Sequence, residues 1–330
     1  MSVNTIRLLV FFIIVTFSES TRCFAGTPCF NENDSLDHTR NTIIFISDTQ
    51  SPMWFEKLFV PTHRNDEATK ILLHSITDDS TVTSVFLFGD ITAMSSFEFH
   101  WATIDSFLSR LQVKHISAFA TAGNHDYLLS SNTGEANLKK RFPDFRRTGY
   151  TVHYGSFALV FLNSNFGELN PSEEIQQQEW YNQELRSLEQ DSTIKLVAVG
   201  CHHSPYSNST IVGHSQQVRN KFIPSFMKSD KCRLFLSGHA HTFQHFQDTV
   251  AQKHFLVLGG GGGLLHTLKG GDPQELQDEV RWNTEYRMFH YVRGIFTAQG
   301  LSLSVMMLTE DLYGPLPVYE VFIPFPRLEK

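Results

Sequence analysis

Five apolar segments of this chain end at side chains that can bind a metal ion. Carboxylates, amide oxygens and imidazoles are the ordinary protein ligands of divalent cations. In chain order these side chains are Asp48, Gln50, Asp90, Asn124, His125, His202, His203, His239 and His241. A single Asp after a strand is more often a cap or turn residue, and a single His is more often a satisfied, partly buried side chain. Five such endings, each at the same place in its segment, favour joint metal binding instead.

The segments that carry these side chains have the pattern of buried strands. The runs TIIFI, SVFLF and KLVAV are short and apolar, which is typical of strands buried on both faces. Helical patterns lie between such runs at 66–79, 96–111 and 171–190, and a late hairpin is expected to turn at Gln299-Gly300. Alternating strands and helices predict a layered α/β fold, in which the carboxyl ends of the strands open onto one crevice. The metal-binding side chains could therefore meet at one point.

Composition limits the kind of partner. The chain has 330 residues, of which 41% are apolar, and its formal net charge is −7. No block of Lys or Arg interrupts the sequence, which argues against a nucleic-acid-binding surface and for a small partner. No internal repeat or Pro-rich linker marks a boundary, so we expect one domain over 42–330 after an extension at 26–41.

The first 25 residues have the layout of a signal peptide. An apolar run of ten residues follows Arg7, and small residues precede a cleavage site after Ala25. Ten apolar residues are too few for a membrane anchor, which needs about 20. We therefore expect a secreted or periplasmic protein with no stable anchor after cleavage. Removal of Cys23 with the signal would leave Cys29, Cys201 and Cys232, so at least one thiol would stay unpaired.

Four short motifs, taken together, resemble a known family. They are GD at 89–90, GNHD at 123–126, HSP at 203–205 and GHAH at 238–241. In this order and spacing they are similar to the calcineurin-like metallophosphoesterase family, which also contains the purple acid phosphatases. The resemblance implies a four-layer αββα sandwich with a two-metal site at the carboxyl ends of the strands.

The resemblance also assigns roles to the motif residues. It implies that Asp48 and His241 bind the first metal, that Asp90 bridges both metals, and that a second metal is bound by Asn124, His203 and His239. His203 is preferred over His202 because the ligand in the family lies two positions before the Pro, here Pro205. His125 would be a proton donor or a clamp on a substrate oxygen, with Asp126 orienting it. The neighbours His202, Tyr127 and Tyr206 are candidates for substrate binding.

Two positions depart from the family pattern. Gln50 stands where the family usually has a His, and its neutral carbonyl oxygen would make the first site harder, favouring Mn²⁺ or Mg²⁺ over Zn²⁺. Ala93 stands where the purple enzymes have a Tyr, so no tyrosinate colour is expected and the chain is at most a distant relative of them. The run of five glycines at 259–263 either lets the backbone approach the metals or forms a flexible turn.

These expectations lead to a hydrolase. An exported phosphoesterase would use two divalent ions, chosen among Mn, Fe, Zn and Mg, and attack a small phosphorylated substrate with a hydroxide that bridges them. A phosphomonoester is favoured, because nothing in the sequence suggests a channel for nucleic acid. Two alternatives stay open: a phosphodiesterase with the same site, and a non-catalytic metal-binding protein in which Gln50 weakens the first site.

Overall fold

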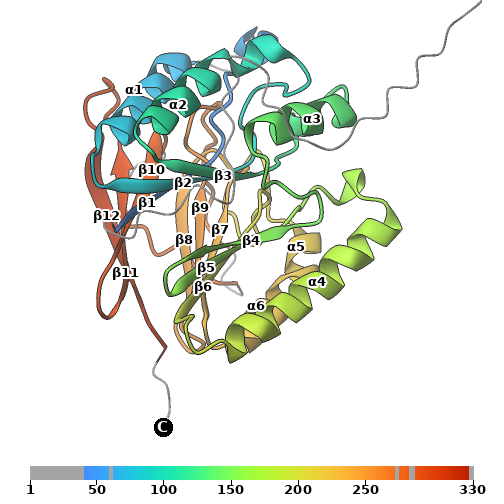
Figure 1. The fold of residues 1–330 in the computed structure, drawn as a ribbon. Coiled ribbons are helices and arrows are strands. Elements are labelled where there is room, and N and C mark those ends of the chain that lie inside the picture. Colours follow the sequence, from blue (N-terminus) through green and yellow to red (C-terminus); the bar gives the residue numbers. More distant parts are fainter. Residues whose placement is uncertain (1–40, 59–61, 272–274, 282–286, 327–330) are drawn as a thin grey trace, which may run out of the picture.

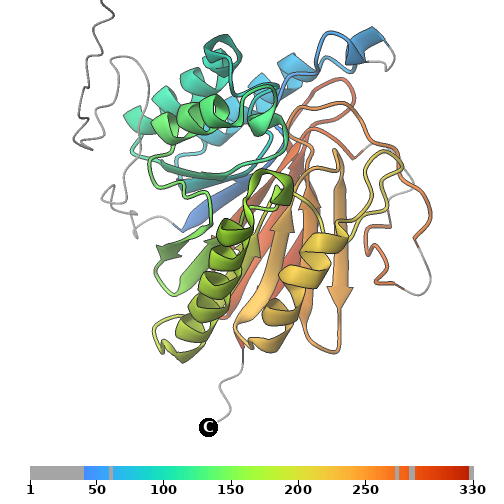
Figure 2. The same ribbon diagram turned by 90° about the vertical axis from the view of Figure 1, so that its right-hand side faces the viewer.

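Two β-sheets face each other in the structure, and helices cover the outer face of each sheet (Figures 1 and 2). The computed structural model describes residues 41–58, 62–271, 275–281 and 287–326. The expected signal peptide and all but the last residue of the expected extension lie outside the described residues. The division into one domain over 42–330 stays a prediction.

The first sheet has the strand order β12-β11-β10-β1-β2-β3. Its parallel part consists of β1 (Thr42–Ile46), β2 (Val82–Phe88) and β3 (Ser117–Thr121), whose residues are all buried as the apolar runs predicted. The antiparallel part consists of β10 (His290–Phe296), β11 (Gly300–Met307) and β12 (Leu316–Pro324). The pairing of β10 with β11 confirms the expected hairpin.

The second sheet has the order β4-β5-β6-β7-β9-β8. Four of its strands are parallel: β5 (Phe157–Phe161), β6 (Leu196–Gly200), β7 (Cys232–Ser237) and β9 (Lys253–Leu258). The edge strands β4 (Tyr150–Tyr154) and β8 (Phe243–Asp248) are antiparallel to their neighbours.

The helices divide between the two outer faces (Figure 1). The first sheet is covered by α1 (Asn65–Asp78), α2 (Ala102–Val113) and α3 (Ser131–Arg141), and the second by α4 (Pro171–Gln190), α5 (Gln216–Lys221) and α6 (Ile223–Lys228). The helix expected at 171–190 is confirmed, and Asn170 caps it by accepting hydrogen bonds from the backbone of Ser172 and Glu173. Within 96–111 the helix begins only at Ala102, because a 3-10 turn occupies Glu98–Trp101.

Aromatic packing joins the two sheets. Phe45, Phe86, Phe88 and Phe161 are all buried between them, with ring centroids 5.4 to 6.2 Å apart. Further apolar clusters lie under the helices on each side. This four-layer αββα arrangement confirms the predicted fold class. None of the helices in the described part of the chain combines the length and apolar character that a membrane crossing requires.

Candidate metal centre

Two groups of possible metal ligands share Asp90. Asp48, Asp90 and His241 form the first group, and Asp90, His202 and His239 form the second. Within each group the ligand atoms lie within 4.8 Å of one another. Asp48 and Asp90 follow β1 and β2 of the first sheet, whereas the histidines follow β6 and β7 of the second. The two sheets therefore meet at these groups, with one carboxylate common to both.

In the first group, the side chains of Asp48, Gln50 and His241 converge on one buried place. The Nδ1 atom of His241 donates to the carbonyl of Leu264 (2.6 Å), which turns Nε2 towards Asp48 Oδ1 at 3.5 Å. The Gln50 amide nitrogen fits as a donor to the carbonyls of Asp48 (3.1 Å) and Asp90 (2.8 Å), and its Oε1 accepts from His241 Nε2 (3.2 Å). Carboxylate, amide and imidazole groups that converge in a buried place suit a bound cation, which would take the place of the His241 proton. The structure thus places Gln50 beside Asp48, Asp90 and His241, and its role as a ligand stays a prediction.

The second group has the same character. The Nδ1 atom of His202 donates to the carbonyl of Phe88 (2.9 Å), so Nε2 is the nitrogen that faces the other members of the group. That nitrogen lies 3.1 Å from Asn124 Oδ1, 3.2 Å from His239 Nδ1 and 3.3 Å from Asp90 Oδ2. Two imidazoles, an amide oxygen and a carboxylate are a ligand set that a divalent transition metal accepts. The donor chemistry of both groups therefore fits divalent cations.

The position of His202 corrects the sequence-based choice of His203. His202 is fully buried in the second group, whereas His203 is partly exposed and its Nδ1 is 2.9 Å from the hydroxyl of Ser164. Counting back from Pro205 fails because both histidines precede it closely, and the sequence cannot show which ring turns inward. The same finding removes His202 from the candidates for substrate binding.

Electrostatics keep the shared carboxylate charged. Burial by itself would raise the pKa of Asp90, but His202 and its neighbours hold that pKa well below the ordinary range. Burial likewise acts to lower the pKa of His202, yet Asp90 and Asp48 outweigh it and raise the pKa to about 9. Asp90 is therefore ionised, as a metal ligand must be.

Three of the candidate ligands have strained backbones. Asp48, Asp90 and His239 have φ values of 58°, 49° and 67°, in the left-handed region that non-glycine residues rarely occupy. Each such residue costs about 1 kcal/mol or more and occurs mainly where function requires it. Local hydrogen bonds hold the geometry: the backbone of His239 donates to Asp48 Oδ2 (3.0 Å), and the backbone of His125 donates to Asp90 Oδ1 (2.8 Å).

The glycine run lies against the centre, which settles the choice left open by the sequence. The backbone of Gly261 donates to the carbonyl of Ser47 (3.0 Å), and that of Gly263 donates to the carbonyl of Asp48 (3.2 Å). A Cβ atom on Gly263 would lie 2.3 Å from the ring of His241. The run therefore lets the backbone approach the ligands closely, and a larger residue would displace them.

His125 stands beside the groups without belonging to either. Its Nδ1 is 3.0 Å from the carbonyl of Ala93 and its Nε2 is 3.9 Å from Asp90 Oδ2. Asp126 does not orient this ring, which corrects the sequence-based expectation. It accepts hydrogen bonds from the hydroxyl of Ser95 (2.6 Å) and the backbone of Gly123 (2.8 Å), and so holds the loop rather than the imidazole.

The two tyrosines proposed as substrate contacts pack against other side chains of the fold. Tyr127 is 5% exposed, and its hydroxyl accepts a hydrogen bond from Asn163 (3.0 Å). Tyr206 packs against Phe246 and Phe255, with the guanidinium of Arg219 4.5 Å from its ring centroid. Both sit next to motif residues in the chain, but their rings are used for contacts inside the fold.

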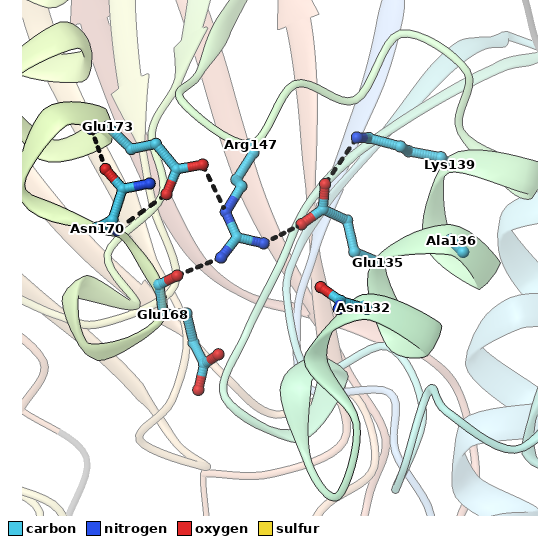
Figure 3. Close-up of a pocket in the computed structure, with 8 residues that line it drawn as sticks. All are labelled: Asn132, Glu135, Ala136, Lys139, Arg147, Glu168, Asn170 and Glu173. Atoms are coloured by element: carbon cyan, nitrogen blue, oxygen red, sulfur yellow. Dashed lines mark hydrogen bonds and ion pairs between the residues drawn. The ribbon is translucent and has the colours of Figure 1, made fainter.

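Arg147 fixes the loop behind Tyr127 (Figure 3). Its guanidinium lies 5.7 Å from the Tyr127 ring centroid and joins Glu135 of α3 to Glu173 of α4, with Nε 3.3 Å from Glu173 Oε1. It also donates to the backbone carbonyl of Glu168. These residues line a cavity of about 490 Å³ between the two helices. Lys139, Arg147, Glu135 and Glu173 are paired with one another, and the Glu168 carboxylate accepts from the hydroxyl of Ser131 (2.6 Å). The cluster therefore joins α3 to α4 beside the loop of His125.

Two residues of the site were missed by sequence reasoning. Ser164 contacts His203, and the backbone of His241 donates to Nδ1 of His266 (3.1 Å), whose ring stacks on His241 at 4.1 Å. Ser164 could have been found, because it follows β5 as the candidate ligands follow their strands. His266 lies in a loop with no pattern that marks it.

Comparisons with known proteins agree with this arrangement. The family model of the calcineurin-like phosphoesterases matches residues 42–243. Among curated proteins no match is found. A purple acid phosphatase, PPD1, from yellow lupin seeds is similar in structure, with a TM-score of 0.65 at 15% identity. The match covers 87% of this chain and 54% of the lupin protein, so the chain spans about half of that relative.

Two further structures are similar. GAP50 of Plasmodium, described as the anchor in the inner membrane complex, has a TM-score of 0.66 at 11% identity, and the match covers 87% of this chain and 89% of that one. A dimetal phosphatase from Danio rerio has a TM-score of 0.55 at 13% identity, covering 86% of this chain and 99% of that one. At such identities these structures show a common fold.

Proposed function

This chain belongs to the calcineurin-like phosphoesterase family, and from that membership we propose that it is an exported, metal-dependent phosphoesterase. Its substrate would be a small phosphorylated molecule, with a phosphomonoester favoured over a diester. The observation that carries the proposal is the shared position of Asp90, which puts two sets of acceptor atoms on either side of one carboxylate.

Each residue set would hold one divalent cation. Asp48, Gln50, Asp90 and His241 would hold the first, and Asp90 with the residues of the second group would hold the second: Asn124, His202 and His239. A pair of such ions supplies a water of lowered pKa as nucleophile and neutralises charge on the phosphoryl oxygens. The Gln50 oxygen supports a preference for Mn²⁺ or Mg²⁺ at the first position.

His125 is the residue of this chain best placed to handle a proton. Its Nδ1 is fixed by the Ala93 carbonyl, so its Nε2 faces the side of Asp90 on which the ligand groups lie. A protonated Nε2 there would stabilise charge on the phosphoryl group or protonate the leaving oxygen. General acid catalysis of this kind contributes about 10²–10⁴ in rate.

Export is proposed on the sequence of residues 1–25, whose charged start, apolar run and small-residue end are typical of a signal peptide. The formal net charge of −7 supports a small substrate over nucleic acid.

The experiment is a metal-dependent assay of purified protein. The metal-free chain would be reconstituted with Mn²⁺, Mg²⁺ or Zn²⁺ and assayed with para-nitrophenyl phosphate and bis-para-nitrophenyl phosphate. We expect turnover only with metal, and faster turnover of the monoester. Faster turnover of the bis ester would make it a phosphodiesterase, and no metal-dependent turnover across a wider phosphoester panel would reject both activities.

One comparison favours a second candidate. The Plasmodium protein matches this chain over most of both lengths and is described as an anchor. A non-catalytic metal-binding role is therefore the alternative. A single bound ion per chain, together with no turnover on the panel, would support it. In that case Gln50→His should create activity by restoring the family's usual ligand.

A further inference from the structure

We propose that His203 donates a hydrogen bond from Nε2 to a phosphoryl oxygen of the substrate, and does not bind metal. This inference rests on the proposed function and names a residue of the same site that binds the substrate. It follows from the hydrogen bonds that fix the two neighbouring histidines, His202 and His203, in opposite tautomers.

Ser164 sets the tautomer of His203. The Ser164 hydroxyl oxygen accepts a hydrogen bond from the backbone N–H of His203 (2.9 Å) and lies 2.9 Å from its Nδ1. The Ser164 proton is then available for Nδ1 of His203 or for the sulfur of Cys201, and an imidazole nitrogen is the stronger acceptor of the two. The Cys201 thiol itself donates to the carbonyl of His203 (3.2 Å). With Nδ1 as the acceptor, the neutral ring carries its proton on Nε2.

His202 has the opposite arrangement. Its Nδ1 donates to the Phe88 carbonyl, so its Nε2 is the nitrogen that faces Asp90, Asn124 and His239 and that would give up its proton to a cation. A bare nitrogen can bind a cation, whereas an N–H cannot. Of the two adjacent histidines, His202 would therefore bind a cation through a lone pair, and His203 would donate a hydrogen bond through an N–H.

The ring of His203 is placed at the edge of the second group. Its centroid lies 4.4 Å from that of His239 and 5.0 Å from that of His202. Unlike His202, it is partly exposed, and among the described residues Nε2 has no hydrogen-bond partner. A tetrahedral oxyanion that binds at the second group would therefore come next to this N–H. Hydrogen bonds from neutral donors to such anions are strong because the acceptor is charged.

The test compares His203→Ala with His202→Ala in the metal-reconstituted protein. Metal content per chain would be measured by mass spectrometry, and the affinity for inorganic phosphate by calorimetry. We expect His203→Ala to keep its metals and to bind phosphate about tenfold to hundredfold more weakly, the range of a hydrogen bond to a charged group. His202→Ala should lose metal. His203→Gln, which keeps an N–H donor, should recover most of the phosphate affinity.

Ser164→Ala provides a second route to the same answer if His203→Ala does not fold. It should keep metal content and weaken phosphate binding, because it frees the tautomer of His203. Loss of metal from His203→Ala, or phosphate affinity unchanged in His203→Ala or Ser164→Ala, would overturn the proposal. So would a wild-type protein that binds metals but no phosphate. Phosphate binding without turnover of any ester would reject the proposed phosphoesterase activity. The phosphate affinity of His203→Ala would still show whether His203 binds the phosphoryl group.

Discussion

The Oε1 atom of Gln50 lies 3.2 Å from Nε2 of His241 and accepts a hydrogen bond from it. The amide is held this way because its nitrogen donates to the carbonyls of Asp48 and Asp90. An oxygen thus stands where the family usually places an imidazole. The replacement keeps a ligand in position but changes its chemistry from nitrogen to oxygen.

Exchange of Gln50 should therefore change metal preference. We expect Gln50→His to shift the first site from Mn²⁺ towards Zn²⁺, because imidazole is the softer ligand. Gln50→Ala should reduce the content of one metal only. The protein would be reconstituted with equimolar Mn²⁺ and Zn²⁺ and its metals counted. Identical metal ratios in wild type and Gln50→His would show that this side chain does not bind metal.

His125 should affect turnover without affecting metals. Its ring belongs to neither ligand group, but its Nε2 is 3.9 Å from Asp90 Oδ2. We expect His125→Ala to retain its metals and to have a kcat about 10²–10⁴-fold lower, as expected for removal of a general acid. Steady-state kinetics with metal analysis on the same sample checks this. Unchanged turnover with metals retained would remove His125 from the mechanism.

Gly263 should be required for the first site. A Cβ there would lie 2.3 Å from the His241 ring, which the Leu264 carbonyl and the stacked His266 prevent from moving freely. We expect Gly263→Ala to weaken metal binding at one site about 10–100-fold. The matched control is Gly270→Ala, since nothing lies within 4 Å of a Cβ there. Equal metal affinities for the two variants, measured by competitive titration, would contradict the prediction.

Arg147 should contribute to stability. Arg147→Met leaves Glu135 and Glu173 without their common partner, and side-chain exposures of 11% to 28% keep these charges only partly hydrated. We expect a loss of about 1–3 kcal/mol in the free energy of unfolding, measured with urea. Arg64→Met, which breaks the exposed pair with Glu67, should leave stability unchanged. A similar effect of both substitutions would mean that the Arg147 cluster is no more than a surface network.

Stability should fall on mild acidification because of His245 and His254. Their rings are buried and joined by a 3.0 Å contact between His245 Nε2 and His254 Nδ1. Burial, with a smaller effect of His254, lowers the pKa of His245 to about 3, and burial, with a smaller effect of Arg233, lowers that of His254 to about 4. The unfolded chain has histidine pKa values of about 6.5, so it binds more protons between about pH 6.5 and pH 4.

The free energy of unfolding therefore falls by up to about 1.4 kcal/mol per pH unit for each of these histidines as the pH falls through that window. Urea unfolding of metal-free protein at pH 7.0 and pH 5.5 measures this loss. His254→Gln, which keeps an acceptor for His245, should show a smaller loss than wild type. An equal loss of stability in both proteins would mean that other titrating groups cause the pH dependence.

The sequence by itself determined the layered fold and most of the candidate ligands. Apolar runs such as TIIFI specify buried strands. Residues at the strand ends, such as Asp48 and Asp90, reach the same crevice regardless of the conformation of the loops. The helix at Pro171–Gln190 was predictable because its start signals are local. In contrast, α3 has little apolar periodicity and includes Gly134, so nothing in its sequence predicted it.

Tertiary structure alone decided which of two adjacent histidines turns towards Asp90. His202 and His203 have the same chemistry and lie one position apart, so a sequence pattern cannot separate them. The carbonyl of Phe88 at the end of β2 and the hydroxyl of Ser164 after β5 determine which nitrogen of each ring turns inward. The same holds for Asp126 and Tyr127, whose partners come from other loops. Hydrogen-bond partners of this kind exist only after the chain has folded.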